Sequence, residues 1–283
     1  MSQSKQALRT RIRSIGSTRK ITKAMEMIAN AKLLKQRNKM EANREYATKL
    51  QDTVNEIAIR NPEIQNDYMK QKSTTKKLTI MFGSDLGLCG SYNQNAIKYA
   101  KENLNLEDPI YVIGSSIHHQ MVEEGFNVLN EKPISTDDLD FIGLKHYVEV
   151  GIDQYLTNQT GGLQILYTRF VNTMSFEPSL KQLLPFSMDE EPVNASEMHQ
   201  ETLFEPDAET ILDTLIPMMI ADVTYACWME SSTAEQGSRR MAMKTATDNA
   251  DELSDTLRLQ YNKARQSAIT QEITEIVSGS TAV

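Results

Sequence analysis

The stretch RKITKAMEMIANAKLL, residues 19–34, decides the fold of this chain. Its apolar residues recur every third or fourth position, as they do on one face of an α-helix. Three basic residues stand near its start, and a single acid, Glu26, lies within it. Such a stretch suits a nucleic-acid-binding arm, a targeting peptide, a membrane-surface helix or part of a long helical shaft. The surrounding sequence has to decide among these.

The helical pattern extends in both directions from this stretch. Residues 2–60 contain no Pro and one Gly, Gly16. The phase of the apolar positions shifts between groups, so we expect an imperfect heptad. A helix of this length is about 80 Å long, too long for a compact domain, and must pair with another long helix or project outward. The apolar positions are Leu8, Ile12, Ile15, Ile21, Met25, Ile28, Ala47, Leu50, Val54 and Ile57.

The other end of the chain has the same character. Between residues 207 and 277 the only Pro is Pro217 and the only Gly is Gly237. One helix would reach roughly 100 Å here. We expect a kink at Pro217 and a weak, helix-poor patch at SSTAEQGS, residues 231–238. The predicted apolar stripe consists of Leu253, Leu257, Tyr261, Ala264 and Ala268, extended by Ile269, Ile273 and Ile276.

The charge is distributed unevenly. The net charge is −8, which argues against generic binding to nucleic acid or anionic lipid, yet residues 1–40 hold eleven Lys or Arg and one acid. Residues 207–283 hold twelve acids and six bases. The basic head therefore either attracts the acidic end or meets an acidic partner. We predict that residues 1–60 and 207–283 pair as a two-stranded, left-handed, antiparallel coiled coil.

The middle of the chain, residues 76–180, predicts a small Rossmann-like α/β domain. Strands are expected at 76–83, 110–114 and 163–172, with helical patterns around 92–104, 115–124 and 136–156. Residues 181–206 contain Pro and many acids, and they predict an exposed connection into the last helix. The predicted fold class is thus an α/β domain carried by a long coiled coil.

Composition narrows the functional classes. The two cysteines, Cys89 and Cys227, are expected to be free thiols, and the four histidines are not spaced as metal ligands, so no zinc site and no cofactor are expected. The longest apolar run, residues 215–221, falls short of the ~20 residues that cross a bilayer. The Arg-rich start resembles a transit peptide, but its helical pattern continues past any cleavage point.

The glycine-rich stretch GSDLGLCG, residues 83–90, follows a predicted strand and precedes a helix. Glycines there could cradle a phosphate, but the spacing matches neither the dinucleotide fingerprint nor the P-loop. A tight turn, with Asp85 as a cap or turn residue, is the simpler interpretation. A nucleotide-binding α/β enzyme stays open as an alternative. So does a basic coiled-coil adaptor for nucleic acid or membrane, because Arg and Lys of the head could grip phosphates.

Four motifs together resemble the gamma subunit of bacterial F-type ATP synthases: ITKAMEMIANAKL (21–33), FGSDLGLCGSYN (82–93), RRMAMKTATDNA (239–250) and YNKARQSAITQEITEIVSGSTA (261–282). The resemblance implies a central rotor stalk without catalytic groups. It would turn inside a ring of three alpha and three beta subunits, with its middle domain near the epsilon subunit and the membrane c-ring. It would be a peripheral protein at the cytoplasmic face of the cell membrane.

The matching motifs also imply which residues contact the beta subunits. On the first helix these are Lys20, Lys23 and Met25; on the last they are Arg240, Arg265, Gln266 and Thr270. The last segment, SGSTAV (278–283), has no side-chain charge. Such a tail is usually a frayed end, but one that completes a long apolar-striped helix could instead lodge in an apolar collar.

Overall fold

A computed structural model describes residues 5–64, 66–187, 205 and 207–280. The chain forms two compact units: residues 1–30 with 239–283, and residues 31–238. Two long helices, α1 (Lys5–Arg60) and α5 (Ala208–Ser280), contribute to both units. Most of the predicted connection 181–206 and the end of the predicted tail 278–283 lie outside the described residues.

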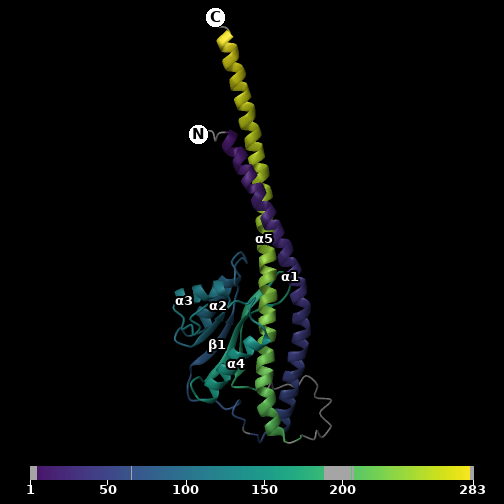
Figure 1. Ribbon diagram of the computed structural model, residues 1–283, viewed down its shortest axis with the longest axis vertical. Coiled ribbons are helices and arrows are strands. Elements are labelled where there is room, and N and C mark those ends of the chain that lie inside the picture. The colour runs from purple at the N-terminus through teal and green to yellow at the C-terminus, as the bar shows by residue number, and fades with distance from the viewer. Residues whose placement is uncertain (1–4, 65, 188–204, 206, 281–283) are drawn as a thin grey trace. The chain divides into compact units, whose positions relative to one another are not determined.

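The first unit is a pair of antiparallel helical segments, as predicted. Figure 1 shows the start of α1 (purple) beside the later part of α5 (yellow-green). Arg19 forms an ion pair with Asp251, and the hydroxyl of Thr22 lies 2.8 Å from that of Thr247. Residue numbers rise on one helix as they fall on the other, which fixes the antiparallel direction.

The seam between these helices follows a heptad more closely than the apolar residues alone predict, although one heptad position on α1 is the exposed Arg19. On α5 the buried residues advance in alternating steps of four and three. On α1 the same steps connect Leu8 to Ala29, but some of the steps fall on polar residues such as Thr22 and Glu26, which an apolar-only pattern misses. Predicted stripe residues point outward instead: Ile21 is 60% exposed and Leu253 is 42% exposed. The buried α5 positions are Met243, Thr247, Ala250, Ser254 and Leu257.

The second unit is built on a four-stranded sheet of order β2-β1-β3-β4. Strands β1 (Lys77–Phe82), β2 (Ile110–Ile113) and β3 (Gly162–Phe170) are parallel and confirm the three predicted strands. Strand β4 (Phe176–Leu184) pairs antiparallel with β3 and was not predicted. It is an edge strand that contains Pro178, and its residues do not alternate between buried and exposed as those of a typical strand do. The connection therefore begins after Leu184, not at residue 181.

Helices cover both faces of the sheet (Figure 1). Side chains alternate along the strands, so Met81 packs with α2 (Tyr92–Asn103) and α3 (Ser115–Glu123), whereas Leu78 and Ile80 face the other side. There they pack against α4 (Phe141–Leu156) and against the parts of α1 and α5 within this unit. Both long helices are thereby core elements of the unit.

Helix α5 continues through Pro217 and through residues 231–238, so the predicted helix-poor patch is wrong. Tertiary packing overrides the weak propensity: Ser231, Thr233 and Ala234 are buried. Gly237 allows Phe176 to approach, since a Cβ there would stand 2.6 Å from the Phe176 Cζ.

Among the described helices, α5 alone has the length and composition of a possible membrane span. An 18-residue stretch of it reaches a mean hydropathy of 1.3, and 44% of that stretch is buried inside the protein. The longest uninterrupted apolar run did not reveal this stretch, because a mean hydropathy over 18 residues can be high even when scattered polar residues interrupt the run. Leu212, Ile216 and Ile220 near its start are fully buried in the core around the sheet, as in a core helix.

Candidate functional site

Four of the predicted contact residues lie where both helices of the first unit are present. Lys20 and Lys23 are exposed on α1, and the Lys23 ammonium pairs with Glu26 one turn along, at 2.9 Å. Met25 is half-buried and so belongs partly to the helix seam. Arg240 on α5 is also half-buried.

The other three, Arg265, Gln266 and Thr270, are exposed on the last part of α5. By the antiparallel register, the described start of α1 stands opposite roughly residue 265 of α5. Gln266 and Thr270 line a shallow hollow on this helix, and the Thr270 hydroxyl donates to the Gln266 carbonyl at 3.0 Å. The seven residues therefore form two groups, with Arg240 and Arg265 roughly 38 Å apart along α5. Their role in contacting a partner stays a prediction.

The helix pair carries a strong positive charge. Residues 5–30 of α1 hold seven Lys or Arg against one acid, a net charge of +6, and all seven are exposed. Residues 239–280 of α5 hold six acids and six bases, so they do not neutralise that charge. The acidic excess of α5 lies before residue 239, in the other unit. Of the two possibilities left by the sequence, this distribution favours an acidic partner.

The last described turns of α5 expose apolar side chains instead of burying them in the seam. Ile269, Ile273 and Ile276, predicted to extend the stripe, are 44%, 57% and 72% exposed, and Val277 is 57% exposed. Their surroundings contain no α1 segment among the described residues of the unit. An exposed apolar end on a charged helix pair indicates a covering partner surface.

The loop at 83–90 is held by its own polar groups. The Asp85 carboxylate accepts from the Ser115 amide at the start of α3, from the Ser135 hydroxyl and from both the amide and the hydroxyl of Thr136. Burial favours the neutral carboxyl, but these hydrogen bonds outweigh it, and the pKa of Asp85 is lowered. The prediction that Asp85 is a cap or turn residue is confirmed. The carboxylate lies at the start of α3, and its negative charge beside the loop disfavours a phosphate there.

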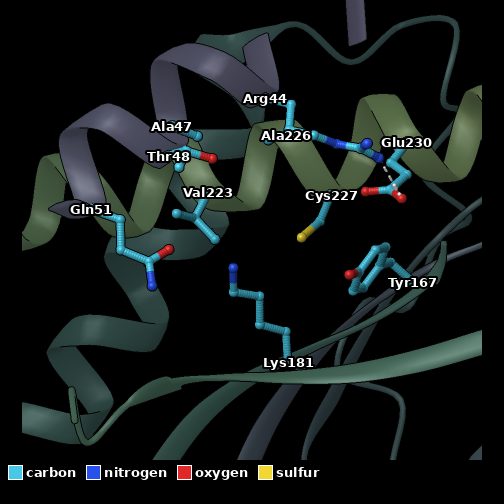
Figure 2. Close-up of a pocket in the computed structure, with 10 residues that line it drawn as sticks. All are labelled: Arg44, Ala47, Thr48, Gln51, Tyr167, Lys181, Val223, Ala226, Cys227 and Glu230. Atoms are coloured by element: carbon cyan, nitrogen blue, oxygen red, sulfur yellow. Dashed lines mark ion pairs between the residues drawn. The ribbon is translucent and has the colours of Figure 1, made fainter. Parts of the chain in front are cut away.

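A second site was not recognised in the sequence, and it lies at the start of the segment 231–238 that was predicted to be helix-poor. We call it the polar junction: Glu230 and Ser231 on α5, Arg44 on α1, Tyr92 on α2, and the Thr168 and Phe170 amides of β3. Figure 2 shows the Arg44–Glu230 ion pair, 2.8 Å between Nη2 and Oε1. The only sequence signal was a run of small polar residues inside an otherwise apolar helix.

A cavity of about 150 Å³ adjoins this junction between α1, α5 and the β3–β4 hairpin (Figure 2). Cys227 lies in its wall and is buried, and burial raises the pKa of its thiol to about 12. Burial likewise raises the pKa of Tyr167 on the opposite wall. Both groups are therefore neutral near pH 7, and the charged groups lining the cavity are Arg44, Lys181 and Glu230.

Comparisons with known proteins agree along the whole chain. The sequence pattern of a family described as ATP synthase matches residues 4–283. Similar curated relatives are ATP synthase gamma chains from Alkaliphilus metalliredigens, 36% identical with 98% of each chain covered, and from Mycoplasma mobile, 35% identical with 97% of each covered. A third, from Thiobacillus denitrificans, is 36% identical with 98% of each covered.

Solved structures share the fold. Two cryo-EM structures of Euglena gracilis mitochondrial ATP synthase each contain a chain similar to this one. In rotational state 3 the TM-score is 0.68 at 17% identity, with 98% of this chain and 94% of that chain covered. In the rotor in rotational state 1 it is 0.62 at 16% identity, with 94% and 98% covered. The predicted fold class is confirmed.

Proposed function

The chain belongs to the family of ATP synthase gamma chains, and from that membership we propose that it is the central rotor stalk of a proton-translocating F-type ATP synthase. The observation that carries the proposal is similarity along the whole length, since the curated relatives cover 97 or 98% of this chain. Both helix ends and the sheet between them fall within that match.

In this function the helix pair turns inside a ring of three alpha and three beta subunits. A stalk acts on such a ring only if it makes different contacts with each state of the catalytic sites. The net charge of +6 on the α1 segment supports contacts to acidic surfaces of beta, and the exposed Ile269, Ile273 and Ile276 support an apolar collar. Lys20, Lys23, Met25, Arg240, Arg265, Gln266 and Thr270 are the proposed contact residues.

The sheet unit is proposed to engage the membrane side of the machine, namely the c-ring and the epsilon subunit. One solved structure that covers 80% of this chain, at a TM-score of 0.57, is the central stalk and c-ring of a mitochondrial ATP synthase from Tetrahymena thermophila. Because the curated relatives are bacterial, the proposed location is the cytoplasmic face of the cell membrane, held there through the complex.

We further propose that this chain supplies torque and asymmetry but no catalytic group, while ADP and phosphate react on the beta subunits. Of the alternatives, the nucleotide-binding enzyme is disfavoured, because the Asp85 carboxylate would repel a phosphate at the loop. A nucleic-acid or membrane adaptor would use the same basic helix. It does not account for full-length membership in this family.

Purification of the native complex through a tag on this chain tests the proposal. Native mass spectrometry is expected to show one copy with three alpha and three beta subunits, and ATP hydrolysis in the same fraction. Recovery of the tagged chain alone, or with nucleic acid and no larger nucleotide-binding subunits, would overturn it.

A further inference from the structure

The polar junction replaces a missing strand. The pairing of β3 with β1 ends at Leu166 opposite Met81, so the amides further along that edge of β3 have no strand beside them. The Thr168 amide donates instead to the Ser231 hydroxyl at 3.3 Å, and the Phe170 amide donates to Glu230 Oε1 at 3.0 Å. Amides two apart on a strand face the same edge. Two consecutive side chains of α5 thus continue the hydrogen-bonding edge of the sheet.

The same two side chains reach two further elements. Glu230, with its side chain 11% exposed, pairs with Arg44 of α1 through the oxygen that also accepts from Phe170. The Tyr92 hydroxyl at the start of α2 lies 2.8 Å from the Ser231 hydroxyl and donates to the Ser231 carbonyl at 3.0 Å. Glu230 and Ser231 therefore tie α5 to α1, α2 and β3 at one level.

These contacts differ in kind from the apolar packing that forms the core of the interface. Apolar packing of α5 on the sheet is non-directional, so it resists rotation of the helix about its own axis only weakly. Hydrogen bonds lose strength steeply when distance or angle changes. A buried carboxylate that must keep both an amide and a guanidinium tolerates little displacement. Among the directional contacts of α5 in this unit, those at Glu230 and Ser231 bond it to the sheet itself, so they restrict its angle against the sheet most directly.

We propose that Glu230 and Ser231 are positioning residues that lock the rotational setting of α5 and α1 against the sheet, so that torque passes between sheet and helices without slip. This inference rests on the proposed rotor function. It explains why small polar residues interrupt an apolar helix where the sheet ends. It also gives Arg44 a mechanical role, because that residue joins α1 to the same carboxylate.

Coupling in inverted membrane vesicles tests the inference, with pumping measured as protons moved per ATP hydrolysed. The variant combining Glu230→Ala and Ser231→Ala is expected to lower this ratio at least about twofold, since a connected polar network loses more than its separate bonds. The single variants Glu230→Gln and Arg44→Met are expected to lower this ratio less, and to similar extents. Each removes the ion pair, but the Phe170 amide still has a hydrogen-bond acceptor: the amide oxygen of Gln in the first variant and the Glu230 carboxylate in the second. The control Glu45→Ala changes an exposed acid on α1 and should leave the ratio unchanged.

Hydrogen exchange provides a readout that a general loss of stability would not reproduce. The Thr168 amide should exchange faster in Ser231→Ala, and the Phe170 amide faster in Glu230→Ala, with β1 amides unchanged. An unchanged pumping ratio in the two singles and in any assembled double variant would overturn the inference. Wild-type protein that fails to assemble with the ring would instead overturn the proposed function, so the two failures are distinguishable.

Discussion

The hydroxyl of Thr247 on α5 donates to the hydroxyl of Thr22 on α1 at 2.8 Å, across the seam of the helix pair. Both residues stand at heptad positions that an apolar pattern leaves blank, with Thr247 buried and Thr22 half-buried. Polar residues at such positions fix the register of paired helices. The relationship defines which side of each helix faces its partner.

Leu257 and Leu253 stand four residues apart on α5, but only Leu257 lies in the seam, 3% exposed against 42% for Leu253. Leu257→Ala should lower the free energy of unfolding by about 2–4 kcal/mol, because it removes buried methyl groups. Leu253→Ala should cost under about 1 kcal/mol. Urea unfolding of the full chain measures both. Equal costs would contradict the heptad assigned to the seam.

Gly237 and Gly16 provide an opposed pair of glycine-to-alanine changes in the two long helices. A Cβ at Gly237 would meet the Phe176 ring, so Gly237→Ala should destabilise the protein by about 1–3 kcal/mol. Nothing lies within 4 Å of the Cβ position at Gly16, where alanine should stabilise the helix by roughly 0.5–1 kcal/mol. Thermal unfolding should shift in opposite directions. A stabilising Gly237→Ala would show that the approach of Phe176 is not constrained.

Asp85 should make the free energy of unfolding depend on pH in the acid range. Its pKa is lowered in the folded chain, so its contribution is complete above the unfolded value of about 3.9 and is lost as pH falls through the folded value. Asp85→Asn should cost about 1–3 kcal/mol at pH 7 through weakened hydrogen bonds. The gap between wild type and variant should narrow below about pH 4. A gap that stays constant down to pH 3 would exclude the ionised carboxylate as its source.

Reversing the positive charge on α1 should slow ATP hydrolysis by the assembled complex. The combined variant Lys20→Glu and Lys23→Glu replaces two exposed cations on the proposed beta-facing surface, one of them paired with Glu26. We expect ATP hydrolysis by the assembled complex to fall about tenfold at low salt, and less at high salt because screening weakens the repulsion. Lys98→Glu, an exposed change on α2, is the control. Equal activity in all three proteins would remove Lys20 and Lys23 from the contact surface.

Much of the fold could be predicted from periodicity. The three parallel strands, the helices between them and the two long terminal helices leave strong patterns over many residues. The edge strand β4 could not be recognised, because it contains Pro178 and its residues do not alternate between buried and exposed. The seam was misread at Ile21 and Leu253, since apolar side chains can point to solvent when polar Thr22 and Thr247 occupy the inside positions.

The two sites of the sheet unit also differed in how far the sequence could predict them. Asp85 was identifiable as a turn residue because the glycine-rich stretch around it is a local signal in the sequence, although its partners Ser115 and Thr136 lie 30 and 51 residues away. Glu230 and Ser231 carry no comparable motif, and only the tertiary fold brings their partners Arg44, Tyr92 and Phe170 to them. A helix-poor segment inside a long helix was the available sign. We interpreted this segment as one of low helix propensity, whereas in the structure it marks a specific contact.

Direct observation of rotation tests the central claim. A bead or rod attached through Lys98→Cys, an exposed position on α2, would report the motion of this chain in a complex whose ring is fixed to a surface. Cys89 and Cys227 are buried and should not compete for the label. With ATP present, the label is expected to turn in one direction and to pause at three evenly spaced angles. A label that stays still while the same complexes hydrolyse ATP would contradict the account.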